Sequence, residues 1–159
     1  MEGMLAALEG STFALVLRTW GVLYPLISGL HILGIALLVG SALAFDMRLA
    51  GLWRASEARA AVRMMAPTAA AGLGLVLATG FLLFSVRASV YAQNPAMLIK
   101  WGLILLGLAN VVLVHLVMRR MAIKNRYRPM TLRVGALVSA AVWIGAILAG
   151  RWIAFTDQF

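Results

Sequence analysis

Four long apolar stretches dominate the hydrophobic pattern, and polar residues gather in the short segments between them. Their approximate ranges are 22–45, 64–86, 96–118 and 134–154. Each stretch reaches the roughly 20 apolar residues that a helix needs to cross the hydrocarbon layer of a membrane. The pattern therefore predicts an all-α integral membrane protein built as a four-helix bundle. The loops leave no room for a separate soluble domain, so residues 1–159 are expected to form a single membrane domain.

The N-terminal segment differs from the four spans because charges interrupt its apolar positions. Glu2, Glu9 and Arg18 alternate with leucine, phenylalanine and valine residues over about 3–20. This pattern predicts an amphipathic helix that lies in the membrane interface. Pro25 suits the first turn of a new helix, so we expect the chain to bend there into the first span.

Basic residues lie beside the spans rather than within them. The chain has 14 Lys and Arg residues and a formal net charge of +9, and ten of the 14 follow the first or the third span. Such an asymmetry is the orientation signal of membrane proteins. We expect the 1–2 and 3–4 loops in the cytoplasm of a bacterial inner membrane, with both termini on the periplasmic side. The net positive charge is thereby explained by the orientation of the spans in the lipid bilayer. Nucleic acid is therefore not expected as a partner.

Composition narrows the chemistry further. Hydrophobic residues make up 64% of the chain and there is no cysteine. The lack of cysteine excludes disulfides, thiolate metal sites, iron–sulfur clusters and thiol-linked haem. No paired carboxylates, nucleophilic triad or phosphate loop indicates a self-contained hydrolase, and the sequence leaves open whether the protein is an enzyme.

The first span contains one histidine, His31, and no charged residue. An ionisable side chain inside a span is costly, and by default it marks a functional site. Small residues of the other spans fall at the same depth, at 78–80, Gly107 and 145–146. This layer leaves volume for a flat macrocycle, which makes His31 a candidate axial ligand of haem b. The alternative is tight packing, with His31 donating a hydrogen bond to Thr79 or to a neighbouring carbonyl.

Three basic residues depart from the charge asymmetry. Arg87, Lys100 and Arg151 each stand at the outer end of a different span. They are candidate partners for the propionates of a haem bound at His31, with Asn94 and Tyr91 supplying hydrogen bonds. The alternative is that their long side chains extend to lipid phosphates at the interface.

His115 is the second histidine within a span and a candidate haem or metal ligand. It lies close to Met118, with Met64 and Met65 at the same level, and imidazole and thioether together suit copper(I) or a second haem. Methionine is also an ordinary filler of helix contacts. From the helical rise, His115 is expected roughly 13 Å deeper than His31, which tells against a single iron shared by both histidines.

Small residues recur at the four-residue spacing that lets spanning helices pack closely. The pairs are Ala36/Gly40, Ala70/Gly74 and Gly145/Ala149.

A wider set of residues supports a family resemblance. The set comprises Tyr24-Pro25, His31-x-x-Gly34, Gly40, Asp46-x-Arg48, Ala78-Thr79-Gly80, Tyr91-x-x-Asn94-Pro95, Lys100, Asn110 and Arg151-Trp152. With these residues the chain resembles, over nearly its whole length, a family of uncharacterised bacterial four-span inner-membrane proteins.

In layout the chain is more remotely similar to the CopD membrane domain of copper resistance and to the HemJ-type protoporphyrinogen oxidase. The latter resemblance implies a b-haem protein with a histidine in an early span and a lysine in a later one. His31 and Lys100 are the positions that match this pair. The interfacial helix, the Asn-Pro turn and His115 depart from that pattern.

Three functions stay open at this point. The first is electron transfer through haem b, with a quinone or a redox protein as partner. The second is the handling of copper or another metal through His31 or His115. The third is a non-catalytic subunit or assembly factor with structural histidines. A homo-oligomer, or a place in a larger complex, is compatible with all three.

Overall fold

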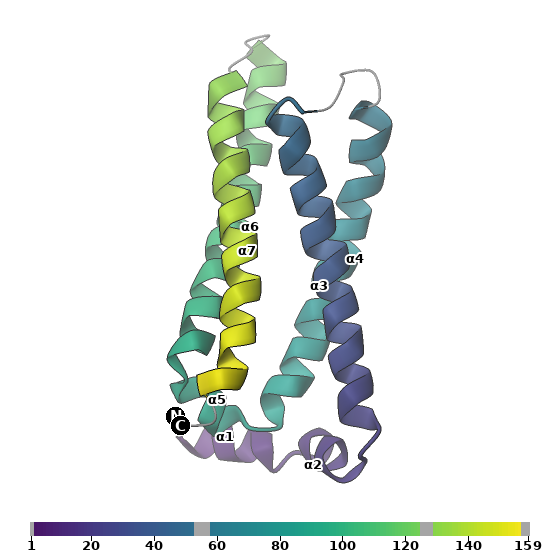
Figure 1. The fold of residues 1–159 in the computed structure, drawn as a ribbon, viewed down its shortest axis with the longest axis vertical. Helices are drawn as coiled ribbons and strands as arrows, with labels where there is room; N and C mark the ends of the chain where they lie inside the picture. The colour runs from purple at the N-terminus through teal and green to yellow at the C-terminus, as the bar shows by residue number, and fades with distance from the viewer. Residues whose placement is uncertain (1, 53–57, 125–128, 157–159) are drawn as a thin grey trace.

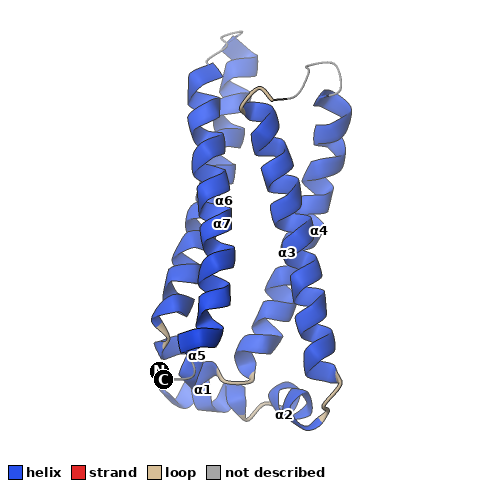
Figure 2. Cartoon of the chain, in the orientation of Figure 1, coloured by secondary structure: helices blue, strands red, loops and turns tan. Residues whose placement is uncertain are grey.

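The computed structural model describes residues 2–52, 58–124 and 129–156, and within them every regular element is a helix (Figure 2). The helices are α1 (Glu2–Glu9), α2 (Thr12–Thr19), α3 (Leu23–Leu49), α4 (Ala58–Ser85), α5 (Ala88–Gln93), α6 (Pro95–Lys124) and α7 (Pro129–Thr156). Four contain segments long and apolar enough to cross a membrane, namely Leu23–Leu49, Met64–Ser85, Pro95–Met118 and Met130–Thr156. The predicted all-α, multi-pass membrane bundle is confirmed.

The four long helices pack as two antiparallel pairs. α3 packs on α4, α6 packs on α7, and α3 also contacts α7 (Figure 1). Within the described part of the chain, the backbones of α4 and α6 do not approach each other closely. The bundle is therefore closed on three sides by helix contacts, and its fourth side is bridged only by side chains.

The N-terminal segment forms two short helices rather than the one that we predicted. Ser11 has an extended backbone and its hydroxyl accepts a hydrogen bond from the Ala14 amide at 3.4 Å, which begins α2 after a break at Gly10. A serine at this position satisfies an amide that has no partner within the helix. Both helices lie across the end of the bundle where α7 ends and α5 lies (Figure 1).

Two polar contacts hold these short helices to the turn between α4 and α6. The Glu9 carboxylate accepts hydrogen bonds from the Ser89 hydroxyl and from the Ser89 amide, the latter at 2.7 Å. The Arg18 guanidinium donates to the Val86 carbonyl, with Nε at 2.9 Å. Through these contacts α1 and α2 are fixed to α5 and to the end of α4.

The closest helix contact is the crossing of α3 and α4. A Cβ atom at Gly72 would lie 2.5 Å from the Leu38 amide nitrogen and 2.9 Å from the Gly34 carbonyl oxygen. A Cβ at Gly34 would in turn lie 3.1 Å from the Val76 nitrogen. Glycine is required at both positions because backbone meets backbone there.

Two of the predicted small-residue contacts were wrong. A Cβ at Gly40 or Gly74 would meet nothing within 4 Å, and Ala36 and Ala70 are exposed. Small residues do allow the close contact between α3 and α4. The glycines that make it are Gly34 and Gly72, however, and they lie on other faces of these helices than Gly40 and Gly74. Gly145 does contact a neighbouring helix, since its Cβ would lie 3.4 Å from the Leu103 side chain.

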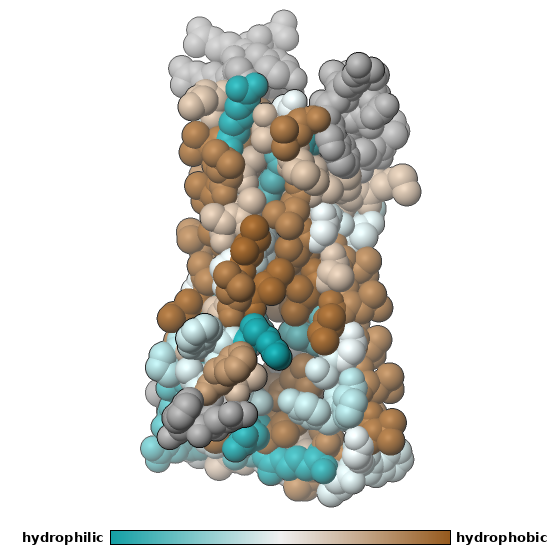
Figure 3. Space-filling model, viewed as in Figure 1, coloured by the Kyte–Doolittle hydropathy of each residue, from teal (hydrophilic) through white to brown (hydrophobic). Residues whose placement is uncertain are grey.

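The surface agrees with a membrane setting. Apolar residues predominate over the middle of the face in Figure 3, and hydrophilic residues gather at the end that carries α1, α2 and α5. Large side chains in mid-span are exposed, for example Ile32, Leu105 and Leu137. In lipid this exposure costs nothing, because the bilayer solvates apolar side chains.

Replacing Gly72 by alanine is expected to destabilise the bundle by about 1–3 kcal/mol, because the added methyl group meets backbone atoms that cannot move separately. Gly74→Ala is the matched control, since it adds the same methyl group to the same helix in open space. The free energy of unfolding in detergent, followed by circular dichroism, measures the effect. Equal stabilities of the two variants would contradict the proposed crossing.

The contact between Glu9 and Ser89 is expected to weaken in acid. The hydrogen bonds from Ser89 lower the pKa of Glu9 in the folded protein, so their contribution is complete above the ordinary pKa of a glutamate, about 4.3. It is lost as the pH falls through the lower, folded-state pKa. Over that range the protection of the α1 amides, which is their hydrogen exchange relative to the intrinsic rate at the same pH, should fall in the wild type. In Glu9→Gln, exchange should not change with pH in this way, and a wild-type response equal to that of the variant would rule the contact out.

Candidate functional site

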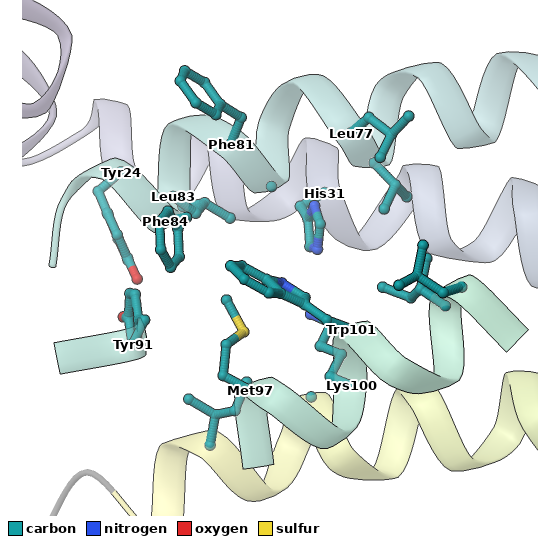
Figure 4. A pocket seen from close by; sticks show the side chains of 16 residues that line it. Tyr24, His31, Leu77, Phe81, Leu83, Phe84, Tyr91, Met97, Lys100 and Trp101 are labelled. Carbon is teal, nitrogen blue, oxygen red and sulfur yellow. The ribbon is translucent and has the colours of Figure 1, made fainter. Parts of the chain in front are cut away.

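A cavity of about 700 Å³ lies where α4 and α6 separate. Its wall takes in Tyr24 and His31 of α3, Tyr91 of α5, several residues each of α4 and α6, and two residues of α7. Figure 4 shows His31 on one side, with Met97 and Trp101 of α6 facing it. The lining is mostly apolar and aromatic, which is typical of sites for small organic ligands and cofactors.

Aromatic side chains bridge the side of the bundle that the backbones leave open. The rings of Phe84 on α4 and Trp101 on α6 lie 5.3 Å apart between centroids, and the rings of Phe84 and Tyr91 lie 6.3 Å apart. These distances are typical of tilted aromatic pairs. The cavity thus has a wall of rings between α4 and α6.

His31 is held in one orientation by α4. Its Nδ1 lies 2.9 Å from the Thr79 hydroxyl oxygen, and the Thr79 hydroxyl lies 2.5 Å from the Leu75 carbonyl. The hydroxyl has one proton, and the carbonyl can only accept, so Thr79 donates to Leu75 and accepts from His31. Nδ1 of His31 therefore carries the proton, and Nε2 keeps a free lone pair. Of the two hydrogen-bond partners that the tight-packing alternative offered for His31, a neighbouring carbonyl or Thr79, the structure shows the contact with Thr79.

Gly80 makes this placement of the imidazole possible. A Cβ at Gly80 would lie 3.1 Å from Cε1 and 3.7 Å from Nδ1 of His31. The ring therefore rests against the bare backbone of α4, one residue beyond its hydrogen-bond partner Thr79. Of the small residues predicted opposite His31, Thr79 and Gly80 contribute here, whereas Ala78 is exposed. Gly107 and Gly145, by contrast, pack against Trp143 and Leu103 elsewhere in the bundle.

Lys100 brings a cationic side chain into the same cavity. It is partly buried and lies along α7, where its Nζ would be 3.3 Å from a Cβ at Gly150. Gly150 thus provides the space through which the lysine passes between α6 and α7. Among the described side chains that line this cavity, Lys100 is the only lysine or arginine.

The remaining predicted site residues divide into two groups. Tyr91 lines the cavity, whereas Arg87, Arg151 and Asn94 do not. The Arg151 guanidinium stacks over the Phe155 ring, 5.6 Å from its centroid. Arg87 is exposed at the start of α5.

Asn94 has a structural task at the start of α6. Its side-chain oxygen accepts a hydrogen bond from the Ala96 amide at 2.9 Å, and its side-chain nitrogen donates to the Thr156 hydroxyl at 2.9 Å. It thereby caps α6 and joins it to the end of α7. Its polar atoms are engaged in these contacts and do not face the cavity.

His115 lies in a second, smaller cavity, separate from that of His31. Its Nδ1 is 3.0 Å from the Val111 carbonyl, and its ring stacks on Phe45 at 6.3 Å between centroids. No methionine lines this cavity, and Met64 is 73% exposed. Across the described residues, no three histidine or acidic side chains come together as a metal site. The two histidines thus belong to two different sites, as their depths predicted.

DUF6644, a family of unknown function, matches residues 5–156. The chain belongs to this family. The predicted kinship with an uncharacterised family is thereby confirmed, and no curated protein and no solved structure matches.

Sequence reasoning missed several residues that line the larger cavity. Met97, Trp101 and Ile104 were not singled out, although Trp101 and Ile104 stand four and seven residues after Met97, and Lys100 three residues after it, which are the spacings that place residues on one face of a helix. That spacing is the signal that could have found them, because Lys100 itself had been singled out on the same face. Gly150 gave no such signal, because its role depends on where the lysine side chain crosses α7.

The orientation of His31 leads to a direct spectroscopic prediction. In protein without bound metal or haem, ¹⁵N NMR of labelled histidine should show His31 as the neutral tautomer protonated at Nδ1. Thr79→Val removes the acceptor and should give a mixture of tautomers. The chain has two histidines, so His115→Gln assigns the signals. A wild-type His31 protonated at Nε2 would contradict the arrangement.

Proposed function

We propose that this protein binds a b-type haem in the larger cavity, with Nε2 of His31 as an axial ligand, and acts in electron transfer within the membrane. The observation that carries the proposal is the hydrogen bond between His31 and Thr79. Histidines that bind metals usually donate their other ring N–H to such a second partner, which fixes the tautomer and the ring plane. Here Nδ1 is the ring nitrogen that meets this partner, so Nε2 holds the lone pair of the neutral ring, and the side chain lines a cavity.

The residues around the cavity fit a haem in size and in chemistry. A volume of about 700 Å³ falls within the usual range for cofactor sites. Trp101 and Phe84 offer flat apolar surfaces, and Lys100 offers the cation that a propionate requires. Bound there, a haem would supply a one-electron redox centre inside the bilayer. Lys100 replaces the predicted trio of cations as the propionate partner.

Met97 is the residue we infer as a second ligand. It lines the same cavity from α6, and a methionine thioether opposite a histidine is a known haem ligand pair. His115 is not proposed for this role, because it lies in the other cavity. The same histidine and methionine would also suit copper(I), but a cavity of this size favours an organic cofactor over a single ion.

The partner and the location belong to the same proposal. We place the protein in a bacterial inner membrane with its basic loops in the cytoplasm. The distribution of Lys and Arg along the chain supports that orientation. The wall between α4 and α6 consists of side chains alone. An electron carrier that is soluble in the membrane, such as a quinone, could therefore approach the cavity from the lipid; a redox protein is the alternative partner.

The test is to purify the protein in mild detergent and to record oxidised and dithionite-reduced visible spectra, with metal analysis on the same sample. The wild type should show about one b-type haem per chain. His31→Ala should lose the haem, and His115→Ala, the matched control, should retain it. Thr79→Val should weaken haem affinity by about 10–100-fold through the loss of the positioning hydrogen bond.

The alternatives predict other outcomes of the same experiment. Full haem content and an unchanged spectrum in His31→Ala would overturn the proposal. A colourless protein that carries copper would favour metal handling through His31 and Met97. A protein that stays colourless and free of metal after haem supplementation would favour a subunit or assembly factor with a structural histidine.

A further inference from the structure

The smaller cavity, about 40 Å³ in volume, lies between α3, α6 and α7. Four polar residues line it: Asp46, Asn110, His115 and Ser139. It is far smaller than the cavity beside His31 and shares no lining residue with it. What it could do is therefore independent of the function proposed above.

Asp46 is the unusual member of this group. Its side chain is only 6% exposed, and its Oδ2 atom has no hydrogen-bond partner in the described part of the chain. Ser139 is the hydrogen-bond partner of the carboxyl group. An ionised carboxylate that is buried without a paired cation is strongly disfavoured relative to a protonated one. The geometry therefore favours a neutral, protonated Asp46.

The charged groups near Asp46 do not change this expectation. On α3, Arg48 follows two residues later; on α7, Arg133 lies beside Gly51, with its Nη2 3.4 Å from a Cβ placed there. On α6 the titratable neighbour is His115. The described side chains of α4, at 64–85, include no titratable group. The side chain that meets the Asp46 carboxyl group among the described residues is that of Ser139.

His115 provides a proton acceptor on the opposite wall. Its Nδ1 donates to the Val111 carbonyl, which can only accept, so Nε2 of the neutral ring has a free lone pair. The side chain is exposed, and it stands three residues before the end of the candidate span at Met118. The imidazole thus connects the cavity with the outside of the bundle.

We propose that Asp46 carries a proton in the resting protein and exchanges it with His115 through water held in this cavity. A cavity of about 40 Å³ has room for a water molecule, and the polar side chains among its lining residues, Asp46, Asn110, His115 and Ser139, are the partners that such a water needs. In the forward step the carboxyl O–H bond breaks and an N–H bond forms at Nε2, which leaves a carboxylate and an imidazolium. No electron moves, and the imidazolium releases the proton to the aqueous phase.

Infrared spectroscopy of the protein in lipid nanodiscs tests the first half of the proposal. The chain has two aspartates, Asp46 and Asp157, so ¹³C labelling of the aspartate carboxyl group in an Asp157→Asn background marks Asp46 without changing it. At pH 7 a carboxylic-acid C=O band that shifts with the label is expected. Asp46→Asn should lack that band, and Glu9→Gln should keep it. A label that shifts only carboxylate bands would show an ionised Asp46 and would overturn the proposal.

Exchange into D₂O tests the second half. The Asp46 C=O band should shift to its deuterated position at least about tenfold more slowly in His115→Gln than in the wild type, because the exchange partner has been removed. The band itself should remain in this variant, which separates a transfer role from a structural one. Equal exchange rates in the two proteins would rule out His115 as the partner. If Asp46→Asn fails to fold, the isotope label in the Asp157→Asn protein still decides the protonation state.

Discussion

The crossing of α3 and α4 at Gly34 and Gly72 is the contact on which the larger site depends. Because backbone meets backbone there, the antiparallel helices keep a fixed register. One turn before Gly34 on α3 comes His31, and two turns after Gly72 on α4 come Thr79 and Gly80. The register thus places the imidazole against a hydroxyl and a bare stretch of helix. The site on which the proposed function rests is a consequence of two glycines that do not themselves touch the cavity.

The larger cavity exists because the bundle is asymmetric. α3 packs on both α4 and α7, but no equivalent contact closes α4 on α6. Aromatic rings fill the side that is left, and α5 with the interfacial helices lies at the same end of the bundle. Glu9 and Arg18 hold those helices to the turn after α4. The polar contacts at the surface therefore support the end of the bundle in which the apolar cavity lies.

The two histidines illustrate how one residue type serves two sites. In both, Nδ1 is occupied by a partner on a helix, Thr79 for His31 and the Val111 carbonyl for His115, and Nε2 remains free. The surroundings then differ. His31 faces a cavity of organic-cofactor size with a lysine in its wall, whereas His115 shares a cavity of water size with a buried carboxyl group. The first setting suits ligation and the second suits proton exchange.

The sequence by itself determined the four spanning helices, because hydropathy and length suffice for that, and it singled out His31, with Thr79 as one of two possible hydrogen-bond partners. It did not determine which residues share a cavity. Apolar side chains surround α3 and α6 almost evenly, so periodicity does not reveal which face of each helix points inward. Lys100 reaches the larger cavity, whereas Arg87 and Arg151 do not line it. Met97, Trp101 and Asp46 gained their positions only when packing fixed the rotation of each helix. In a bilayer that rotation is set by close contacts such as Gly72 on Gly34 rather than by hydrophobic burial.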